Sequence, residues 1–187
     1  MTEKQELRKV MRAMRKGLSD EAQRIASEAV CKRMLAFAPY QEADCVMAYV
    51  ACRGELDVSP VIEDILISGK HLVLPRCEAD GIMTARRITS LDQLVSGAYG
   101  IPAPQETSEI VPPQEIDFIL VPGTAFDGDG YRLGQGGGYY DHFMKETNAI
   151  RAGVCHDEAL LERVPHEAHD LRMDAVITPG TLLLCGD

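Results

Sequence analysis

Apolar residues in the first part of the chain recur with the spacing of a helix. They fall at i, i+3, i+4, i+7 and i+11 and form one apolar stripe: Leu7, Val10, Met11, Met14 and Leu18. Gly17 suits the end of this helix, and Ser19 is a favourable N-cap for a second one. We expect the second helix to continue to about Phe37, because Pro39 then interrupts the pattern.

From Cys45 onward, short apolar runs alternate with helical segments. The runs predict strands at Cys45–Ala51, His71–Leu74, Ile82–Ile88, Ile116–Val121, Arg151–Cys155 and Ala175–Thr178. Helices are predicted at Pro60–Ile67 and Tyr139–Thr147, with a helical turn at Leu91–Ser96. Because the strands are apolar throughout, both faces of their sheet should be covered. We therefore predict an α/β fold: three layers, α/β/α, with a mostly parallel central sheet.

The composition is that of a globular protein, with 187 residues, 45% of them hydrophobic and 26% charged. The Pro-rich residues 101–115 are the one candidate internal boundary, but such a loop more often crosses the surface of one domain. We expect a single domain over residues 1–187.

The formal net charge of −10 argues against a general nucleic-acid binder, because affinity for a phosphate backbone comes mainly from Lys and Arg. The first 16 residues differ from this average, since they carry six basic and two acidic side chains. Lys4, Arg8, Arg12 and Arg15 flank the apolar stripe of the first predicted helix. This distribution is compatible with a small polyanion bound at one local site.

The N-terminal segment lacks the apolar core of a signal peptide, and no apolar run approaches the roughly 20 residues of a membrane-spanning helix. The six cysteines are scattered, without a CxxC pair. Buried reduced thiols are therefore expected rather than disulfides or a zinc site. We expect a cytoplasmic monomer without a membrane or nucleic-acid partner.

A glycine-rich stretch, residues 122–141, is the most unusual part of the sequence. It contains seven of the chain's 16 glycines, follows a predicted buried strand directly and runs into a predicted helix. Glycines let the backbone approach a phosphate, and a helix N-terminus attracts an anion. Arg132 adds a planar, permanently charged donor group, and Asp141 is a candidate ligand for Mg²⁺. The stretch predicts a phosphate-binding loop.

Other interpretations of these motifs are weaker, although a tight strand-to-helix connection without a ligand stays open. The stretch lacks the Gly-Lys-Ser/Thr of a P-loop, and the last glycine of a dinucleotide fingerprint would fall on Tyr139. Asp127-Gly-Asp129 lacks the spacing of a calcium loop. His166 and His169 are one residue too close for the HExxH zinc motif.

The segment 132–141, RLGQGGGYYD, preceded by PGTAFD at 122–127, resembles the signature of the 5-formyltetrahydrofolate cyclo-ligases, or 5,10-methenyltetrahydrofolate synthetases. Weaker matches extend the resemblance over nearly the whole chain. They are the opening pair Lys4 and Arg8, the Glu-containing turn Gly54–Asp57, His169-Asp170, and Ile177-Thr178.

The resemblance implies an ATP- and Mg²⁺-dependent ligase. In the family reaction, the formyl oxygen on N5 of 5-formyltetrahydrofolate takes the γ-phosphoryl group of ATP. N10 then closes the ring and phosphate leaves, so that the products are the methenyl folate, ADP and phosphate. Such an enzyme needs positive charge around the triphosphate and a pocket that holds N10 close to the activated carbon. The folate can carry a polyglutamate tail.

The resemblance also implies roles for individual residues. The ATP-binding residues would be Lys4, Arg8, Arg132, Gly134, Gln135, Gly136, Gly137, Gly138, Tyr139 and Tyr140. The folate-binding residues would be Glu55, Gln135, Gly136, Gly137, Gly138 and Tyr139. Arg132 would be catalytic, and Asp141 and Asp170 would bind Mg²⁺. Glu55 would accept the paired N–H donors of the pterin.

The chain departs from some family members within these motifs. Gly137 stands where some have Lys, Gln135 where some have a basic residue, and Val58 where Thr is frequent. Arg132, Lys4 and Mg²⁺ would then neutralise the transferring phosphoryl group.

Two functions of other classes stay open on the residues alone. One is a non-catalytic binder of a phosphorylated metabolite, and the other is an isomerase or transferase acting on a phosphorylated sugar or CoA ester.

Overall fold

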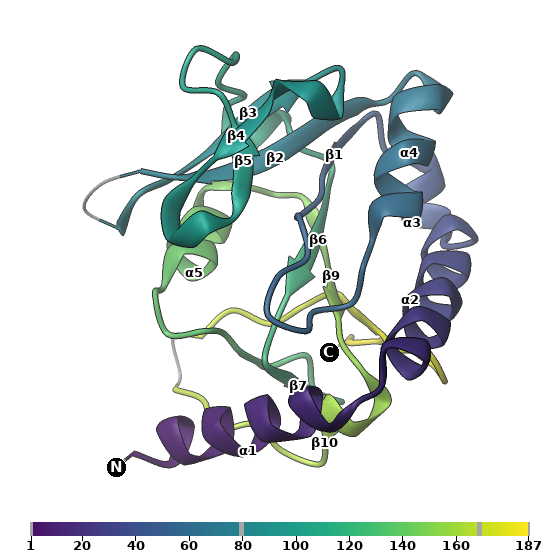
Figure 1. The fold of residues 1–187 in the computed structure, drawn as a ribbon, viewed down its shortest axis with the longest axis vertical. Coiled ribbons are helices and arrows are strands. Elements are labelled where there is room, and N and C mark those ends of the chain that lie inside the picture. Colours follow the sequence, from purple (N-terminus) through teal and green to yellow (C-terminus); the bar gives the residue numbers. More distant parts are fainter. Residues whose placement is uncertain (1, 79–80, 168–169, 187) are drawn as a thin grey trace.

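The computed structural model describes residues 2–78, 81–167 and 170–186, and a seven-stranded sheet forms its centre (Figure 1). In spatial order the strands are β12 (Leu182–Leu184), β11 (Ala175–Ile177), β9 (Ile150–Val154), β6 (Phe118–Pro122), β1 (Cys45–Met47), β2 (His71–Cys77) and β3 (Met83–Ile88). All inner pairs are parallel, and the edge strands β3 and β12 pair antiparallel with their neighbours. The predicted mostly parallel sheet is confirmed.

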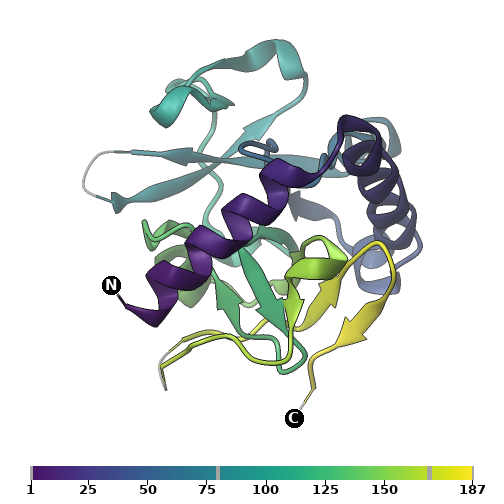
Figure 2. The same cartoon turned by 60° about the horizontal axis from the view of Figure 1, so that its bottom comes forward.

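Helices cover both faces of this sheet. Residues of α2 (Asp20–Leu35), α3 (Ala38–Glu42) and α4 (Ser59–Ser68) pack in the core on one face. Residues of α1 (Glu3–Gly17) and α5 (Tyr139–Phe143) pack on the other, where α1 crosses the molecule (Figure 2). Successive strand residues point to opposite faces, so Val46 joins the first core and Met47 the second. The predicted α/β/α layering is confirmed.

The first helix is fixed at both of its ends. Thr2 and Gln5 form a capping box at its start, which satisfies N–H groups that have no partner within the helix. Near its end Arg15 is buried, and its guanidinium donates hydrogen bonds to the carbonyls of Gly123 and Thr124. A charge removed from water needs such partners, so Arg15 ties α1 to the start of the glycine-rich stretch.

Two smaller sheets lie beside the central one. In the first, which we call the β4–β5 ribbon, β4 (Leu94–Ser96) pairs antiparallel with β5 (Pro102–Pro104). The second has the order β10 (Leu160–Leu161), β7 (Ala125–Asp127) and β8 (Arg132–Leu133). Short 3₁₀ turns occupy Leu91–Gln93, Ala98–Gly100, Pro113–Glu115, Met144–Glu146 and Asp157–Ala159.

Several predicted elements have different limits in the structure. Strand β1 ends at Met47 rather than Ala51, and the predicted turn at 91–96 is half 3₁₀ turn and half strand. The strand Leu94–Ser96 pairs with the Pro-rich segment Pro102–Pro104. Ala103, between the two prolines, still has a backbone N–H that can pair with a neighbouring strand. The helix from Tyr139 ends at Phe143 and continues as a 3₁₀ turn. His169 lies outside the described residues.

All six cysteines are free thiols, and the predicted burial is confirmed for Cys31, Cys45 and Cys155, whereas Cys52, Cys77 and Cys185 are partly exposed. Throughout residues 2–78, 81–167 and 170–186, no helix combines the length and the apolar character needed to cross a membrane.

Candidate functional site

A cavity of about 350 Å³ opens at the carboxyl ends of β1, β2 and β6. Tyr49 and Cys52 follow β1, Pro75 and Cys77 belong to β2, and Pro122 ends β6. Part of the glycine-rich stretch, the start of α5 and the β4–β5 ribbon complete its wall. Ligands of open α/β sheets bind at this end of the strands. The topology and the sequence motif therefore indicate the same place.

Residues 134–138, which we call the Gly loop, need their glycines for both conformation and contact. Gly136 and Gly138 have φ angles of 107° and 71°, which side chains rarely tolerate. The carbonyl of Gly134 accepts a 2.8 Å hydrogen bond from Nε of Arg8. A Cβ added to Gly136 would lie 3.6 Å from the guanidinium carbon of Arg8. The Gly loop is thus held against α1, with a cation beside it.

Arg132 is the buried cation of the site, with a side chain only 5% exposed. Its Nη2 donates a 2.7 Å hydrogen bond to Oδ1 of Asp141, and its Nη1 donates a 3.0 Å bond to the carbonyl of Pro122. Its guanidinium carbon lies 5.6 Å from the ring centroid of Tyr140. The buried Nε has no hydrogen-bond partner among the described residues. Arg132 therefore keeps donor capacity next to the cavity.

Positive charge gathers where the Gly loop meets α1. The pKa of Arg8 is lowered by burial, then by the neighbouring charge of Arg12 and, after an opposing effect of Asp141, by Arg132. Like charges held this close favour a multiply charged anion as the partner. Sequence and structure agree on Arg8 and Arg132 as the centre of this cluster.

Lys4 and Asp170 form a 3.0 Å ion pair that joins the start of α1 to the segment after β10. Lys4 lies one helical turn before Arg8. Arg8 is close enough to Asp141 for the charge of that carboxylate to affect the pKa of Arg8. The two carboxylates, Asp141 and Asp170, therefore both lie beside the first turns of α1.

The donor set fits a Mg²⁺ ion shared with phosphate groups. Mg²⁺ takes oxygen ligands and usually keeps waters and substrate phosphates together with one or two carboxylates. In the described part of the chain, no three His, Cys, Asp or Glu side chains are grouped as metal ligands would be. Asp141 and Asp170 would then need phosphate and water oxygens to complete the coordination shell.

Glu55 and Tyr140 supply polar groups inside the cavity. Burial raises the pKa of Glu55. The 3.1 Å hydrogen bond from the backbone N–H of Cys52 and the charge of Arg15 lower this pKa but do not outweigh burial. Burial, then the Glu55 charge, also raises the pKa of Tyr140. The Tyr140 hydroxyl is buried and has no partner in the described chain. Both groups are arranged to bind polar atoms of a ligand.

The remaining predicted residues differ in position. Tyr139, Gln135, Gly137 and Gly138 line the cavity together with Gly134, whereas Gly136 turns toward Arg8. An interaction with the side chain of Tyr99 raises the pKa of Tyr139, and both residues line the cavity.

Val58 is buried in the core beneath α4, with 1% exposure. Replacement of a frequent Thr at this position therefore changes core packing.

Sequence reasoning missed the apolar wall of the cavity. Met83 and Cys77 come from the β2–β3 hairpin, and Tyr99 and Ile101 come from the β4–β5 ribbon. The available signal was the unusual run AYGIPAP at 98–104, in which Tyr99 has a φ of 58°. Arg53 lies 5.8 Å from the Tyr99 ring centroid and continues this wall toward Glu55.

Comparisons with known proteins identify the family of the chain. Residues 1–179 match the 5-formyltetrahydrofolate cyclo-ligase family. The 5-formyltetrahydrofolate cyclo-ligase of Escherichia coli K12 is 30% identical over 177 residues, which cover 91% of this chain and 97% of that protein. The mouse protein of the same name is 27% identical over 187 residues, 93% of this chain and 92% of its own.

Solved structures agree as well. The Aquifex aeolicus 5,10-methenyltetrahydrofolate synthetase superimposes with a TM-score of 0.90 at 36% identity, covering 100% of this chain and 94% of that one. A Mycoplasma pneumoniae synthetase shares the fold, with a TM-score of 0.78 at 21% identity over 95% and 99% of the two chains. The chain belongs to the 5-formyltetrahydrofolate cyclo-ligase family.

Proposed function

We propose that the chain is an ATP- and Mg²⁺-dependent ligase that converts 5-formyltetrahydrofolate to 5,10-methenyltetrahydrofolate. The formyl oxygen attacks the γ-phosphorus of ATP, and ADP leaves. N10 then attacks the activated formyl carbon and closes the ring, its proton is lost, and phosphate leaves with the former formyl oxygen. The observation that carries the proposal is the cavity itself, where half-buried Glu55 and the buried Arg132 side chain share one apolar-walled space with the Gly loop.

The folate is assigned to the inner part of this cavity. The pterin presents paired N–H donors, and the two oxygens of Glu55 are matching acceptors. The raised pKa of Glu55 reflects its burial, and such a carboxylate gains most from ligand donors that replace water. Tyr140 contributes a hydroxyl without a partner, and Tyr139 offers a ring face at the mouth.

The triphosphate is assigned to the groups between the Gly loop and α1. Lys4 and Arg8 lie one helical turn apart on α1, and Arg8 donates to the carbonyl of Gly134 in the Gly loop, which precedes the start of α5. Asp141 and Asp170 would hold Mg²⁺, which when bound supplies positive charge to the phosphate oxygens.

Arg132 is the residue assigned to the transferring group. Its guanidinium is buried, permanently charged and already oriented by Asp141 and Pro122. A fixed cation next to developing charge stabilises a transition state without reorganisation. Because Gly137 stands where some relatives have Lys, Arg132 and Lys4 would provide this charge on the protein's side.

A monomer as the acting unit is also part of this proposal. Acceptance of polyglutamylated folate and a cytoplasmic location are parts of the same proposal.

The test is incubation of the purified protein with 5-formyltetrahydrofolate, ATP and Mg²⁺ while the methenyl absorbance is followed. We expect product only when all three are present. Folate binding without turnover would favour the non-catalytic binder, and a signal without ATP would overturn the proposed reaction.

A further inference from the structure

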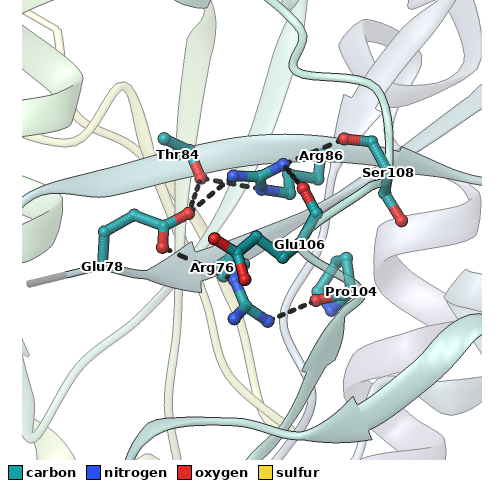
Figure 3. Close-up of polar contacts among 7 residues, drawn as sticks. All are labelled: Arg76, Glu78, Thr84, Arg86, Pro104, Glu106 and Ser108. Atoms are coloured by element: carbon teal, nitrogen blue, oxygen red, sulfur yellow. Dashed lines mark hydrogen bonds and ion pairs between the residues drawn. The ribbon is translucent and has the colours of Figure 1, made fainter.

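The β2–β3 hairpin presents different residues on its two faces. Pro75, Cys77 and Met83 line the cavity. Along both strands they alternate with polar residues, whose side chains therefore point to the opposite face. On that face lies a group that we call the hairpin network (Figure 3): Arg76, Glu78, Thr84 and Arg86.

Arg86 is the centre of the hairpin network and is only 6% exposed. Its Nη2 donates a 2.8 Å hydrogen bond to Glu78, and its Nε donates a 3.1 Å bond to the Thr84 hydroxyl. Its Nη1 donates to two main-chain carbonyls, those of Glu106 and Ser108. One guanidinium thus ties the segment after β5 to the hairpin (Figure 3).

Glu78 orients both arginines of the network. One carboxylate oxygen accepts from Arg86 and Thr84, and the other lies 3.5 Å from Nε of Arg76. Arg76 in turn donates a 2.7 Å hydrogen bond to the carbonyl of Pro104. Burial opposes the charge of Glu78, but its bonds to Arg86 and Thr84 lower its pKa overall, so the network is ionised at neutral pH.

The carbonyls bound by Arg76 and Arg86 belong to Pro104, Glu106 and Ser108, which come directly after the residues of the outer cavity wall in the sequence. Pro104 ends β5, and residues 98–103 just before it include Tyr99 and Ile101 of that wall. Few apolar side chains anchor the β4–β5 ribbon: Ala103 and Pro104 are buried and Leu94 packs on the core, whereas Tyr99 is 71% and Val95 41% exposed. A segment with few buried apolar contacts opens easily unless polar bonds hold it.

We infer that Arg86 and Glu78 are positioning residues for folate binding, which fix the β4–β5 ribbon as the outer wall of the cavity. The inference rests on the proposed function, because it takes the cavity as the folate site. Neither side chain lines the cavity, so both act through the ribbon. A loosened wall must be ordered again when the ligand binds, and this cost lowers affinity without changing the reacting groups.

The variants are Arg86→Lys and Glu78→Gln. Lysine keeps the charge but cannot donate in a fixed fork to Glu78, Thr84 and two carbonyls together. Gln keeps the shape of Glu78 but removes the charge that orients Arg76 and Arg86. The matched control is Arg87→Lys, a substitution at the next residue of β3. Arg87 pairs with Glu109 at 3.4 Å, and Glu109 comes after the last carbonyl that the network binds.

Two readouts are taken on each variant: steady-state kinetics with 5-formyltetrahydrofolate, and hydrogen exchange of residues 94–108 without ligand. We expect the KM for the folate to rise about tenfold with kcat within about twofold, because only the cost of ordering changes. Exchange should accelerate in residues 94–108 and stay unchanged in β6 and β9. The Arg87→Lys protein should match the wild type in both measurements.

An unchanged KM in both variants would overturn the inference, as would exchange that rises uniformly along the chain. If one variant does not fold, the other decides. Absence of product with the wild-type protein would instead refute the proposed function. In that case, hydrogen exchange and direct titration with 5-formyltetrahydrofolate still decide whether the network controls the wall and binding.

Discussion

The Arg132 guanidinium donates a 2.7 Å hydrogen bond to Asp141, one of the two carboxylates assigned to Mg²⁺. The cation assigned to the transferring phosphoryl group is thus held by a candidate metal ligand. Asp141 and Asp170 would hold Mg²⁺, and the bound ion would supply positive charge to the phosphate oxygens beside Arg132. Because the two residues are in contact, different readouts are needed to separate their roles: turnover for Arg132 and the magnesium requirement for Asp141.

Replacement of Arg132 by Ala should lower kcat by about 100-fold or more, because a fixed charge next to the transition state is lost. Stability should change far less, since its partner Asp141 is 49% exposed and can be hydrated. Turnover and thermal unfolding measured on the same preparation check this. Arg24→Ala, in an exposed helical ion pair, is the control. Parallel loss of folding and activity would make Arg132 structural.

Asp141→Asn should raise the Mg²⁺ concentration needed for half-maximal activity, because an amide is a weaker ligand than a carboxylate. The control is Asp174→Asn, which alters a similar ion pair, that of Asp174 with Arg151 at 3.0 Å, away from the cavity. A magnesium titration of both variants is the measurement. If Asp141→Asn and the wild type gave the same titration curve, Asp141 would not be a ligand.

Lys4→Ala and Arg8→Ala should each raise the KM for ATP by about tenfold, since each removes a cation from the assigned phosphate site. The folate affinity should stay within about twofold, because Glu55 and Tyr140 are untouched. Lys9, exposed on the same helix, gives the matched control Lys9→Ala. Equal effects on ATP and folate would show that α1 acts on the whole site instead.

Glu55 predicts a pH dependence of folate binding. Its pKa in the free protein is raised above the ordinary 4.5, mainly by burial. The carboxylate accepts the N–H donors of the pterin, so affinity should fall as the pH drops through this raised pKa. Binding near that pH should release a proton.

Glu55→Gln should lower folate affinity by about tenfold or more and remove the pH dependence. The free variant should be as stable as the wild type or more stable at neutral pH, because a raised carboxyl pKa destabilises the folded state as the pH rises above 4.5. Titration calorimetry at several pH values checks this, with exposed Glu63→Gln as control. An unchanged pH profile in Glu55→Gln would assign the effect to another group.

The sequence allowed prediction of the fold wherever local pattern and tertiary contacts agree. Leu7, Met11 and Met14 of the predicted α1 stripe pack in the core, whereas Val10 is 53% exposed. The apolar runs of β2 and β6 are buried on both faces of the sheet. A phosphate-binding loop could also be predicted from the sequence, because the glycines, Arg132 and Asp141 are close together along the chain.

What escaped prediction depends on contacts between distant segments. Arg15 belongs to a basic helix in the sequence, and only the carbonyls of Gly123 and Thr124 make its burial favourable. The strand Pro102–Pro104 contains prolines that argue against a strand, and it forms because Leu94–Ser96 is beside it. Arg86 shows no local pattern, since the two carbonyls that it binds, those of Glu106 and Ser108, lie 20 and 22 residues further along the chain.

The most direct test of the account uses 5-formyltetrahydrofolate labelled with ¹⁸O in the formyl group. If the formyl oxygen is phosphorylated before N10 closes the ring, each methenyl product formed should be accompanied by one inorganic phosphate that carries the label. The measurement is mass spectrometry of the released phosphate, alongside the methenyl absorbance. Unlabelled phosphate, or methenyl product formed without ATP, would contradict the account.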